Sequence, residues 1–481
     1  MDIGQDTVRD MTLDRRLIQV TPAARQISLQ RKEFYAFVHF TVNTFTGKEW
    51  GDGSESPAIF NPGRLDADQW VAAIRSAGMK GLILTCKHHD GFCLWPSRFT
   101  RHSVAASPFR NGEGDVVREV AEACRRGGIA FGVYLSPWDR NHPTYGYGEA
   151  YNNYFVSQLT ELLTQYGEIF SVWFDGACGE GTNGKKQVYD WERYYRVIRA
   201  LQPDACIHVC GPDVRWCGNE AGDTRESEWS VVPRRTSETE RIAEESQQAD
   251  DASFRQRRIR AQDQDLGSRS MLRDEPDLIW YPAEVNTSIR PGWFYHAEEN
   301  GQVRSVDVLM RIHERAVGGN ATFLLNIPPT PEGLFHPTDC ERLAALGERL
   351  RHTYAVNLLD SASLTVNACE PGHEIDSVRV DDDTTYFMGC EGVAETAVHL
   401  TWESPRSVSR VVLKEQIERS QRMERFSILA RIDGRDVTVY EGTVVGYKRI
   451  ACFPTVTTTM LQLRITDARV CPTLSFLGVY A

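Results

Sequence analysis

The chain has 481 residues, a formal net charge of −12 and a hydrophobic content of 41%. It is too long for one ordinary domain, and its apolar content is sufficient for sizeable cores, so we expect two domains. Proteins that bind nucleic acids usually carry a basic surface. The acidic balance therefore argues against a nucleic-acid partner and favours a neutral, small-molecule substrate.

The start of the sequence, MDIGQDTVRDMTLDRR, has no basic segment followed by an apolar core of signal-peptide length. No other apolar run approaches the length of a membrane span. The twelve cysteines are scattered without a CxxC pair, which is typical of reduced and mostly buried thiols. We therefore expect a cytosolic protein without a membrane partner, and these features leave the oligomeric state open.

Apolar runs alternate with helical patterns through most of the chain, which is typical of βα units around a parallel sheet. The first five runs that we expect to be strands are residues 34–42, 81–89, 129–137, 169–177 and 206–211. Asp66 and Gln69 have the spacing of a capping box at the start of a helix that ends at Gly78. Residues 115–126 carry apolar side chains at helical spacing, so we expect a second crossover helix there.

The alternation continues with expected strands at residues 280–285 and 322–327 and an expected helix at residues 306–316 between them. A (β/α)8-like TIM barrel, an α/β fold, over residues 1–352 is the economical closure of these units. Residues 234–273 interrupt the pattern because they are unusually polar and charged. We interpret them as a solvated insertion or long loop rather than as a partner-binding element.

The pattern changes after the barrel to short strands with period-two alternation, separated by turns such as DG and EG. This pattern predicts an all-β sandwich over residues 353–481. Such a domain could cap the barrel or bind carbohydrate, but its sequence does not single out a platform of exposed aromatic side chains.

Residues 169–177, IFSVWFDGA, form an apolar run that ends in a single carboxyl group, Asp175. A strand buried on both faces reads as a continuous apolar run, and an acid at its carboxyl end lies at the mouth of a barrel, where barrel enzymes hold their catalytic groups. Gly176 would let the chain turn away without crowding a ligand. Taken alone, Asp175 could equally be a strand-end aspartate that bonds the next turn.

Other polar and aromatic side chains follow the neighbouring strand ends. They are His39, Glu49, His88, His89 and Tyr134. Adjacent strand residues point to opposite sides, and no HxH or HExxH spacing accompanies the histidines, so we do not expect a metal. Hydrogen-bonding groups beside flat rings suit a sugar, which has both hydroxyls and an apolar ring face.

The barrel region contains, in order, the motifs FVHF, EWG, KHHDGFCLW, GVYLSPWD, VWFDGA, RPGWFYH and FLLNIPPTPEG. Their order and spacing resemble those of the α-L-fucosidases of glycoside hydrolase family 29. The stretch GPDVRWCGNEAG, followed by SEWSVVP, resembles the subgroup that acts on α-1,3- and α-1,4-linked fucose in branched, Lewis-type glycans.

The resemblance implies a retaining, exo-acting hydrolase without a cofactor that releases fucose from an oligosaccharide by double displacement. Asp175 matches the family's nucleophile, and Glu220, in GNE, best matches the acid/base of the subgroup. Glu226 and Glu228 are the alternative acid/base candidates because they lie in the same stretch of the chain.

The resemblance also implies which residues hold the substrate. The matching fucose-binding positions are His39, Glu49, His88, His89 and Tyr134, with Trp293 near the methyl side of fucose and Trp216 as a wall for the leaving sugar. Three alternatives stay open. They are a fucosidase with broad or α-1,2 preference, a metal-dependent barrel hydrolase in which the three histidines converge, and a catalytically silent glycan-binding protein.

Overall fold

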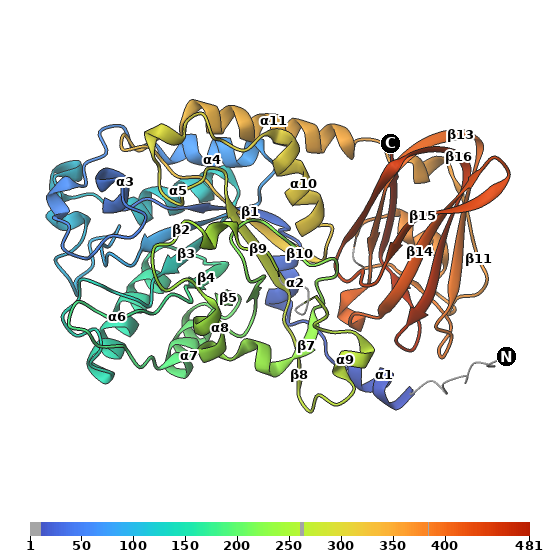
Figure 1. Ribbon diagram of the computed structural model, residues 1–481, viewed down its shortest axis with the longest axis horizontal. Coiled ribbons are helices and arrows are strands. Elements are labelled where there is room, and N and C mark those ends of the chain that lie inside the picture. The colour runs from blue at the N-terminus through green and yellow to red at the C-terminus, as the bar shows by residue number, and fades with distance from the viewer. Residues whose placement is uncertain (1–10, 260–263, 383) are drawn as a thin grey trace.

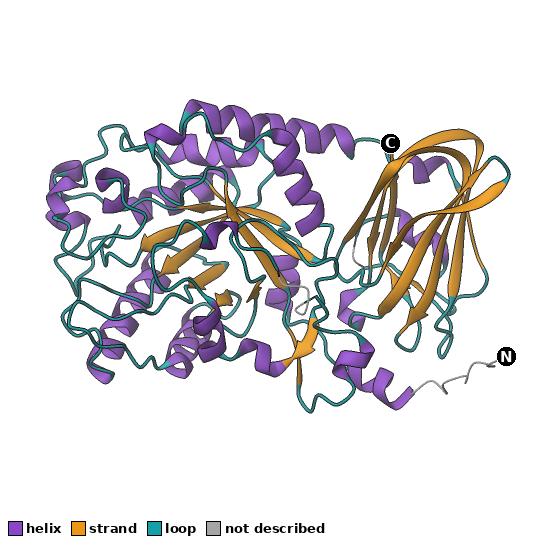
Figure 2. Cartoon of the chain, viewed as in Figure 1, coloured by secondary structure: helices purple, strands orange, loops and turns teal. Residues whose placement is uncertain are grey.

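The computed structural model describes residues 11–259, 264–382 and 384–481 (Figure 1). Most of the N-terminal stretch in which we found no signal peptide therefore lies outside the described residues, as do residues 260–263 of the charged segment. A mixed α/β part comes first in the chain and a part dominated by strands comes second (Figure 2). No helix within the described residues is long and apolar enough to cross a membrane.

An eight-stranded sheet forms the first part, with the strand order β5-β4-β3-β2-β1-β10-β9-β6 and parallel pairing throughout. Its strands are β1 (Phe34–Val38), β2 (Gly81–Lys87), β3 (Ala130–Leu135), β4 (Ser171–Phe174), β5 (Cys206–Val209), β6 (Arg215–Trp216), β9 (Ala283–Ser288) and β10 (Ala321–Asn326). A parallel bridge between His208 and Val214 links the two ends of the sheet. The predicted barrel is therefore confirmed, although the two-residue β6 gave no signal in the sequence.

Helices surround this sheet, as Figure 1 shows. The longer ones are α4 (Ala67–Ser76), α5 (Val116–Gly127), α6 (Glu149–Gln165), α7 (Trp191–Leu201), α10 (Val306–Ala316) and α11 (Pro337–Thr353), and the shorter ones are α1 (Met11–Leu17), α2 (Ala24–Gln30), α3 (Val42–Thr46), α8 (Thr239–Glu245) and α9 (Arg269–Leu272). The helix expected at residues 306–316 has the predicted bounds. A small antiparallel pair, β7 (Val231–Pro233) and β8 (Leu278–Trp280), flanks the charged segment.

The start of α4 forms half of the predicted capping box. The Asp66 carboxylate accepts a hydrogen bond from the backbone N–H of Gln69 at 3.0 Å. The Gln69 side chain turns away, however, and makes a pair of hydrogen bonds to the backbone of Phe335. A distant loop thus takes the amide that would otherwise close the box.

The C-terminal part is a six-stranded antiparallel sheet with the order β11-β13-β16-β14-β15, and β18 pairs with β13. Its strands are β11 (Ser363–Val366), β13 (Thr396–Lys414), β14 (Met423–Ile432), β15 (Arg435–Gly442), β16 (Arg449–Ala468) and β18 (Phe476–Tyr480), and β12 (Phe387–Met388) pairs with β17 (Thr473–Leu474). The two long strands change register partway along their length.

These two long strands build the predicted sandwich. The first half of β13 pairs with β11, whereas its second half pairs with β18. One apolar core contains Val398 and Leu461 from the first region together with Val411 and Val479 from the second. The sheet therefore folds over on itself, and β13 and β16 contribute to both layers.

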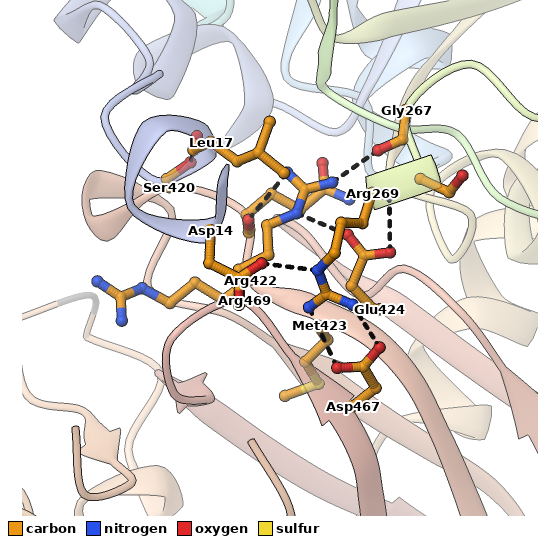
Figure 3. Close-up of polar contacts among 12 residues, drawn as sticks. Asp14, Leu17, Gly267, Arg269, Ser420, Arg422, Met423, Glu424, Asp467 and Arg469 are labelled. Atoms are coloured by element: carbon orange, nitrogen blue, oxygen red, sulfur yellow. Dashed lines mark hydrogen bonds and ion pairs between the residues drawn. The ribbon is translucent and has the colours of Figure 1, made fainter. Parts of the chain in front are cut away.

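Charged side chains cross the boundary between the two parts (Figure 3). Arg269, in the charged segment, binds Asp14 of α1 and Asp467 of β16, each at 2.6 Å. Arg469 donates to Glu424 and to the carbonyl of Gly267, also at 2.6 Å each. Because Arg469 is fully buried, these hydrogen bonds replace the water that its guanidinium loses.

Candidate active site

A pocket opens at the carboxyl ends of the barrel strands and collects nearly all of the residues singled out in the sequence. Its lining includes His39, Glu49, His88, His89, Asp175, Trp216, Glu220 and Trp293. Tyr134 does not line the pocket but contacts Asp175, because its hydroxyl donates to Oδ2 at 2.9 Å. The parallel strands therefore bring together groups that are up to 254 positions apart in the chain, between His39 and Trp293.

Asp175 follows β4 and is only partly accessible to solvent. Its Oδ1 accepts from the backbone N–H of Ala177 at 2.9 Å, and Nε2 of His89 lies 3.8 Å from Oδ2. Burial raises the pKa of Asp175, although the hydrogen bonds from Ala177 and Tyr134 act in the opposite direction. The carboxylate is thus oriented by its neighbours while one side faces the pocket.

A glycine is required at position 176 because another segment of the chain lies close to it, and not because the backbone makes an unusual turn. A Cβ atom at this position would lie 1.9 Å from Oγ of Ser246. Ser246 belongs to the charged segment between β7 and β8, and it also lines the pocket. The glycine therefore makes room for a neighbouring segment, a reason that the sequence did not show.

Glu220 lies in the loop after β6, in a turn closed by the side chain of Asn219. The Asn219 carbonyl oxygen accepts from the N–H groups of Ala221 and Asp223, each at 3.0 Å. The indole N–H of Trp293 donates to Oε2 of Glu220 at 3.0 Å. Burial raises the pKa of Glu220 to about 7, and the charge of Asp175 adds to that rise.

The other two acid/base candidates lie outside the pocket. Glu226 is exposed. Glu228 is fully buried and forms ion pairs with Arg215 at 2.6 Å and Arg225 at 3.2 Å. Burial alone would raise its pKa, but the two arginines bring it below the usual value. The geometry therefore favours Glu220 among the three glutamates.

The three histidines of the rim are neutral around pH 7. Burial lowers the pKa of His39 to about 4 and that of His89 to about 3, and it holds that of His88 well below its usual value. Nδ1 of His39 bonds Asn326, and Nδ1 of His89 bonds Ser136, each at 2.8 Å. Neutral imidazoles can donate to or accept from sugar hydroxyls.

The grouping of these histidines bears on the metal alternative. The ring centroids of His88 and His89 are 4.1 Å apart, and those of His39 and His88 are 5.6 Å apart. Within the described ranges, no three His, Cys, Asp or Glu side chains are arranged so that they could hold a metal ion.

Glu49 anchors the loop that carries Trp293. Its carboxylate accepts from the N–H groups of Trp293 at 2.8 Å and Phe294 at 3.2 Å, from Nε2 of His296 at 2.7 Å and from Arg255 at 2.9 Å. Burial would raise its pKa, but these donors lower it below the usual value. Glu49 is therefore a charged group that holds its surroundings in place as well as lining the pocket.

Most of the described residues of the charged segment at 234–273 are exposed, as expected for a solvated insertion, but the segment also contributes to the pocket. Ser246 and Gln247 line the pocket. Arg255 reaches Glu49, and the ring of Phe254 stacks on Trp216 with 6.3 Å between centroids. The segment is thus one wall of the site. The available signal was Phe254, the one aromatic residue in this polar stretch of the sequence.

Trp173 is a further pocket residue that the sequence could have revealed, because period-two alternation places it on the same face of β4 as Asp175. Its indole N–H donates to the fully buried Glu284 at 2.8 Å. Its ring packs against Phe37 and Tyr134, with 5.0 Å between centroids in both pairs. It forms an apolar floor beside Asp175.

A barrel whose strand ends bring several carboxyl groups into one pocket, beside neutral hydrogen-bonding groups and aromatic faces, is the arrangement of a glycoside hydrolase. Comparison with known proteins agrees. A family model described as Alpha-L-fucosidase matches residues 24–353. The putative alpha-L-fucosidase 1 of Oryza sativa subsp. japonica is 37% identical over 465 residues, which cover 95% of this chain and 84% of the relative.

Two solved structures extend the comparison. A putative alpha-L-fucosidase from Bacteroides ovatus is 42% identical with a TM-score of 0.83, covering 100% of this chain and 77% of that one. A Ruminococcus gnavus GH29 fucosidase in complex with fucose is 28% identical with a TM-score of 0.84, and the match covers 99% of this chain and 96% of that one. The chain belongs to the α-L-fucosidases of glycoside hydrolase family 29 and is a glycosidase.

Proposed function

We propose that this α-L-fucosidase is a retaining, exo-acting enzyme that releases terminal α-1,3- and α-1,4-linked fucose from branched, Lewis-type glycans. Asp175 is the proposed nucleophile and Glu220 the proposed acid/base. The observation that carries the assignment is the pair itself: both carboxyl groups line one pocket, and the pKa of Glu220 is raised to about 7. A carboxyl group of this kind keeps a proton that it can give to a leaving group near neutral pH.

In the first proposed step, Asp175 attacks the anomeric carbon while Glu220 protonates the glycosidic oxygen, so that the leaving sugar departs and a covalent fucosyl-enzyme forms. In the second step, Glu220 takes a proton from water, and the oxygen of that water displaces Asp175. The Tyr134 hydroxyl, which donates to Asp175 at 2.9 Å, stabilises the carboxylate in both its starting and released forms.

The remaining pocket residues are proposed to hold fucose. His39, His88 and His89 present neutral imidazoles to the ring hydroxyls, and Glu49 adds a charged acceptor. Trp293 offers its ring to the apolar side of the sugar, while its indole N–H holds Glu220. The fucose bound to the Ruminococcus gnavus relative supports the same monosaccharide here.

The preference for branched substrates is supported by the position of Trp216. It lies four residues before Glu220 and stacks on Phe254, so the pair offers a flat wall on the side where the protonated leaving sugar departs. A broad or α-1,2 preference is the second candidate, and a cytosolic location remains a prediction from the sequence.

Two measurements test this function. Release of fucose from a linear α-1,2-fucoside and from branched Lewis-type trisaccharides is compared side by side, and exclusive cleavage of the linear substrate would overturn the preference. Proton NMR of the first product then reports the stereochemistry. We expect α-L-fucose to appear before mutarotation, whereas initial β-L-fucose would exclude the double displacement.

A further inference from the structure

The C-terminal sandwich contacts the chain segment that follows the Glu220 loop. Arg449, at the start of β16, donates to the carbonyl of Glu226 at 2.8 Å. The backbone N–H of Ser230 donates to the Gln421 side chain at 2.8 Å, and the hydroxyls of Ser227 and Thr443 are hydrogen-bonded to each other. Residues 226–230 are therefore held from one side by three residues of the sandwich.

Asn320, just before β10 of the barrel, adds a second connection. Its side-chain N–H donates to the carbonyl of Glu228 at 2.7 Å, and its side-chain oxygen accepts from the N–H of Tyr447 in the sandwich, also at 2.7 Å. Its backbone has a positive φ of 67°, a conformation that asparagine tolerates better than most residues. The same side chain thus joins the sandwich to residues 226–230.

An ion-pair cluster carries this constraint on to the Glu220 loop. The Glu228 carboxylate, whose backbone carbonyl accepts from Asn320, binds Arg215 and Arg225. Arg225 in turn donates to the carbonyl of Cys217 at 2.9 Å, at the base of the turn that presents Glu220. All three side chains of the cluster are buried, so breaking one contact would leave an uncompensated charge.

We propose that the sandwich positions the acid/base, with Arg449 as the positioning residue. Arg449 is 4% exposed, does not line the pocket, and also donates to the carbonyl of Val444 within the sandwich at 2.8 Å. It therefore acts on the reaction through residues 226–230, the Glu228 cluster and the turn around Glu220. This inference rests on the proposed role of Glu220, and it gives the sandwich a task other than carbohydrate binding.

The dependence of the rate on the leaving group tests the proposal. A glycoside with a poor leaving group needs protonation by Glu220, whereas an aryl fucoside with a good leaving group needs it much less. In Arg449→Met, we expect a displaced Glu220 to lower kcat/KM about tenfold more for a Lewis-type trisaccharide than for a dinitrophenyl fucoside. This tenfold difference is a part of the rate enhancement that general acid catalysis supplies. The alkaline limb of its pH profile should also move to lower pH as Glu220 becomes more hydrated.

The matched control is Arg410→Met. Arg410 is also an arginine of the sandwich, and it contacts the barrel through Glu314 of α10 at 2.6 Å rather than through residues 226–230. We expect this variant to lose stability without a change in the ratio of the two substrates. Thr443→Val, which removes only the contact to Ser227, should shift the ratio in the same direction as Arg449→Met by a smaller factor and provides the test if Arg449→Met does not fold.

Glu220→Ala is the reference variant. If it shows strong leaving-group dependence while Arg449→Met and Thr443→Val leave the ratio at its wild-type value, the proposal for the sandwich is overturned and the acid/base assignment stands. If Glu220→Ala itself lacks this dependence, the acid/base assignment and the proposal fall together. A loss of equal size on both substrates in the Arg449 and Arg410 variants would also contradict the proposal.

Discussion

At the scale of single residues, the two carboxyl groups that we propose as catalytic have different surroundings. Asp175 accepts hydrogen bonds from Tyr134 and Ala177, whereas Glu220 receives one from Trp293 and is otherwise set in a buried loop. The motif VWFDG predicted that Asp175 lies at the barrel mouth, but taken alone it left the role of this residue open, and only the resemblance to the family assigned it as the nucleophile. Choosing Glu220 over Glu228 from the chain alone was harder, since only the fold shows that Arg215 and Arg225 enclose Glu228.

The first prediction concerns Asp175. We expect Asp175→Ala to lower kcat for fucose release by about 10³-fold or more while retaining substrate affinity, because the variant lacks the atom that forms the covalent intermediate in the proposed mechanism. Turnover with an aryl fucoside and binding by calorimetry measure the two quantities. Asp115→Ala, which removes the N-cap of α5, is the control and should lower the melting temperature but not kcat. Wild-type turnover by Asp175→Ala would exclude the assigned nucleophile.

The second prediction concerns pH. Burial raises the pKa of Glu220 to about 7, so its protonated form persists to higher pH than that of an ordinary glutamate. The proposed first step requires this protonated form, and kcat/KM should therefore fall as pH rises through about 7. Initial rates with a poor leaving group across the neutral range measure the limb. A profile that stays flat through neutrality would count against Glu220 as the acid.

At the scale of elements, local sequence patterns predicted the features that depend on residues close together in the chain, such as helix boundaries. The N-cap of α5 at Asp115 and the bounds of α10 follow from side chains within a turn of each helix end. The contribution of the charged segment between β7 and β8 to the pocket was not predicted, because it depends on distant partners. Ser246 lies next to Gly176, and Arg255 donates to Glu49. The spacing of residues along the chain does not predict these contacts.

The third prediction concerns this segment. The charge of Arg255 lowers the pKa of Glu220, so Arg255→Met should move the alkaline limb of kcat/KM to higher pH. It should also raise KM, because Glu49 loses one of its donors. Arg257→Met is the matched control, since the Arg257 guanidinium lies 5.1 Å from the ring centroid of Phe254 in the same segment. Identical pH profiles for the two variants would show that Arg255 does not act on Glu220.

At the scale of the whole molecule, the barrel and the sandwich share apolar as well as polar contacts. One cluster combines Leu17 and Trp280 of the first part with Ile417 and Tyr447 of the second. Although the change from βα units to alternating strands predicted two architectures, it could not predict this shared cluster. The residues of this cluster come from short apolar stretches, and in the sequence such stretches look like ordinary core positions of either part.

The fourth prediction follows from that cluster. A protein ending at residue 352 should be insoluble or unfolded, because removal of Ile417 and Tyr447 exposes Leu17 and Trp280 and leaves Asn320 without its partner at Tyr447. Soluble yield and circular dichroism of the shortened and complete proteins test this. A soluble shortened barrel with wild-type activity would show that the sandwich is dispensable.

The shared strands of the sandwich also limit where the chain can be opened. Because β13 and β16 pass through both layers, new termini placed within either strand would divide both layers at once. The exposed turn between β14 and β15, where Asp433 and Gly434 both have positive φ, joins neighbouring strands of one layer. A circular permutant of this enzyme should therefore begin at Gly434, where the cut separates a hairpin and leaves every long strand whole.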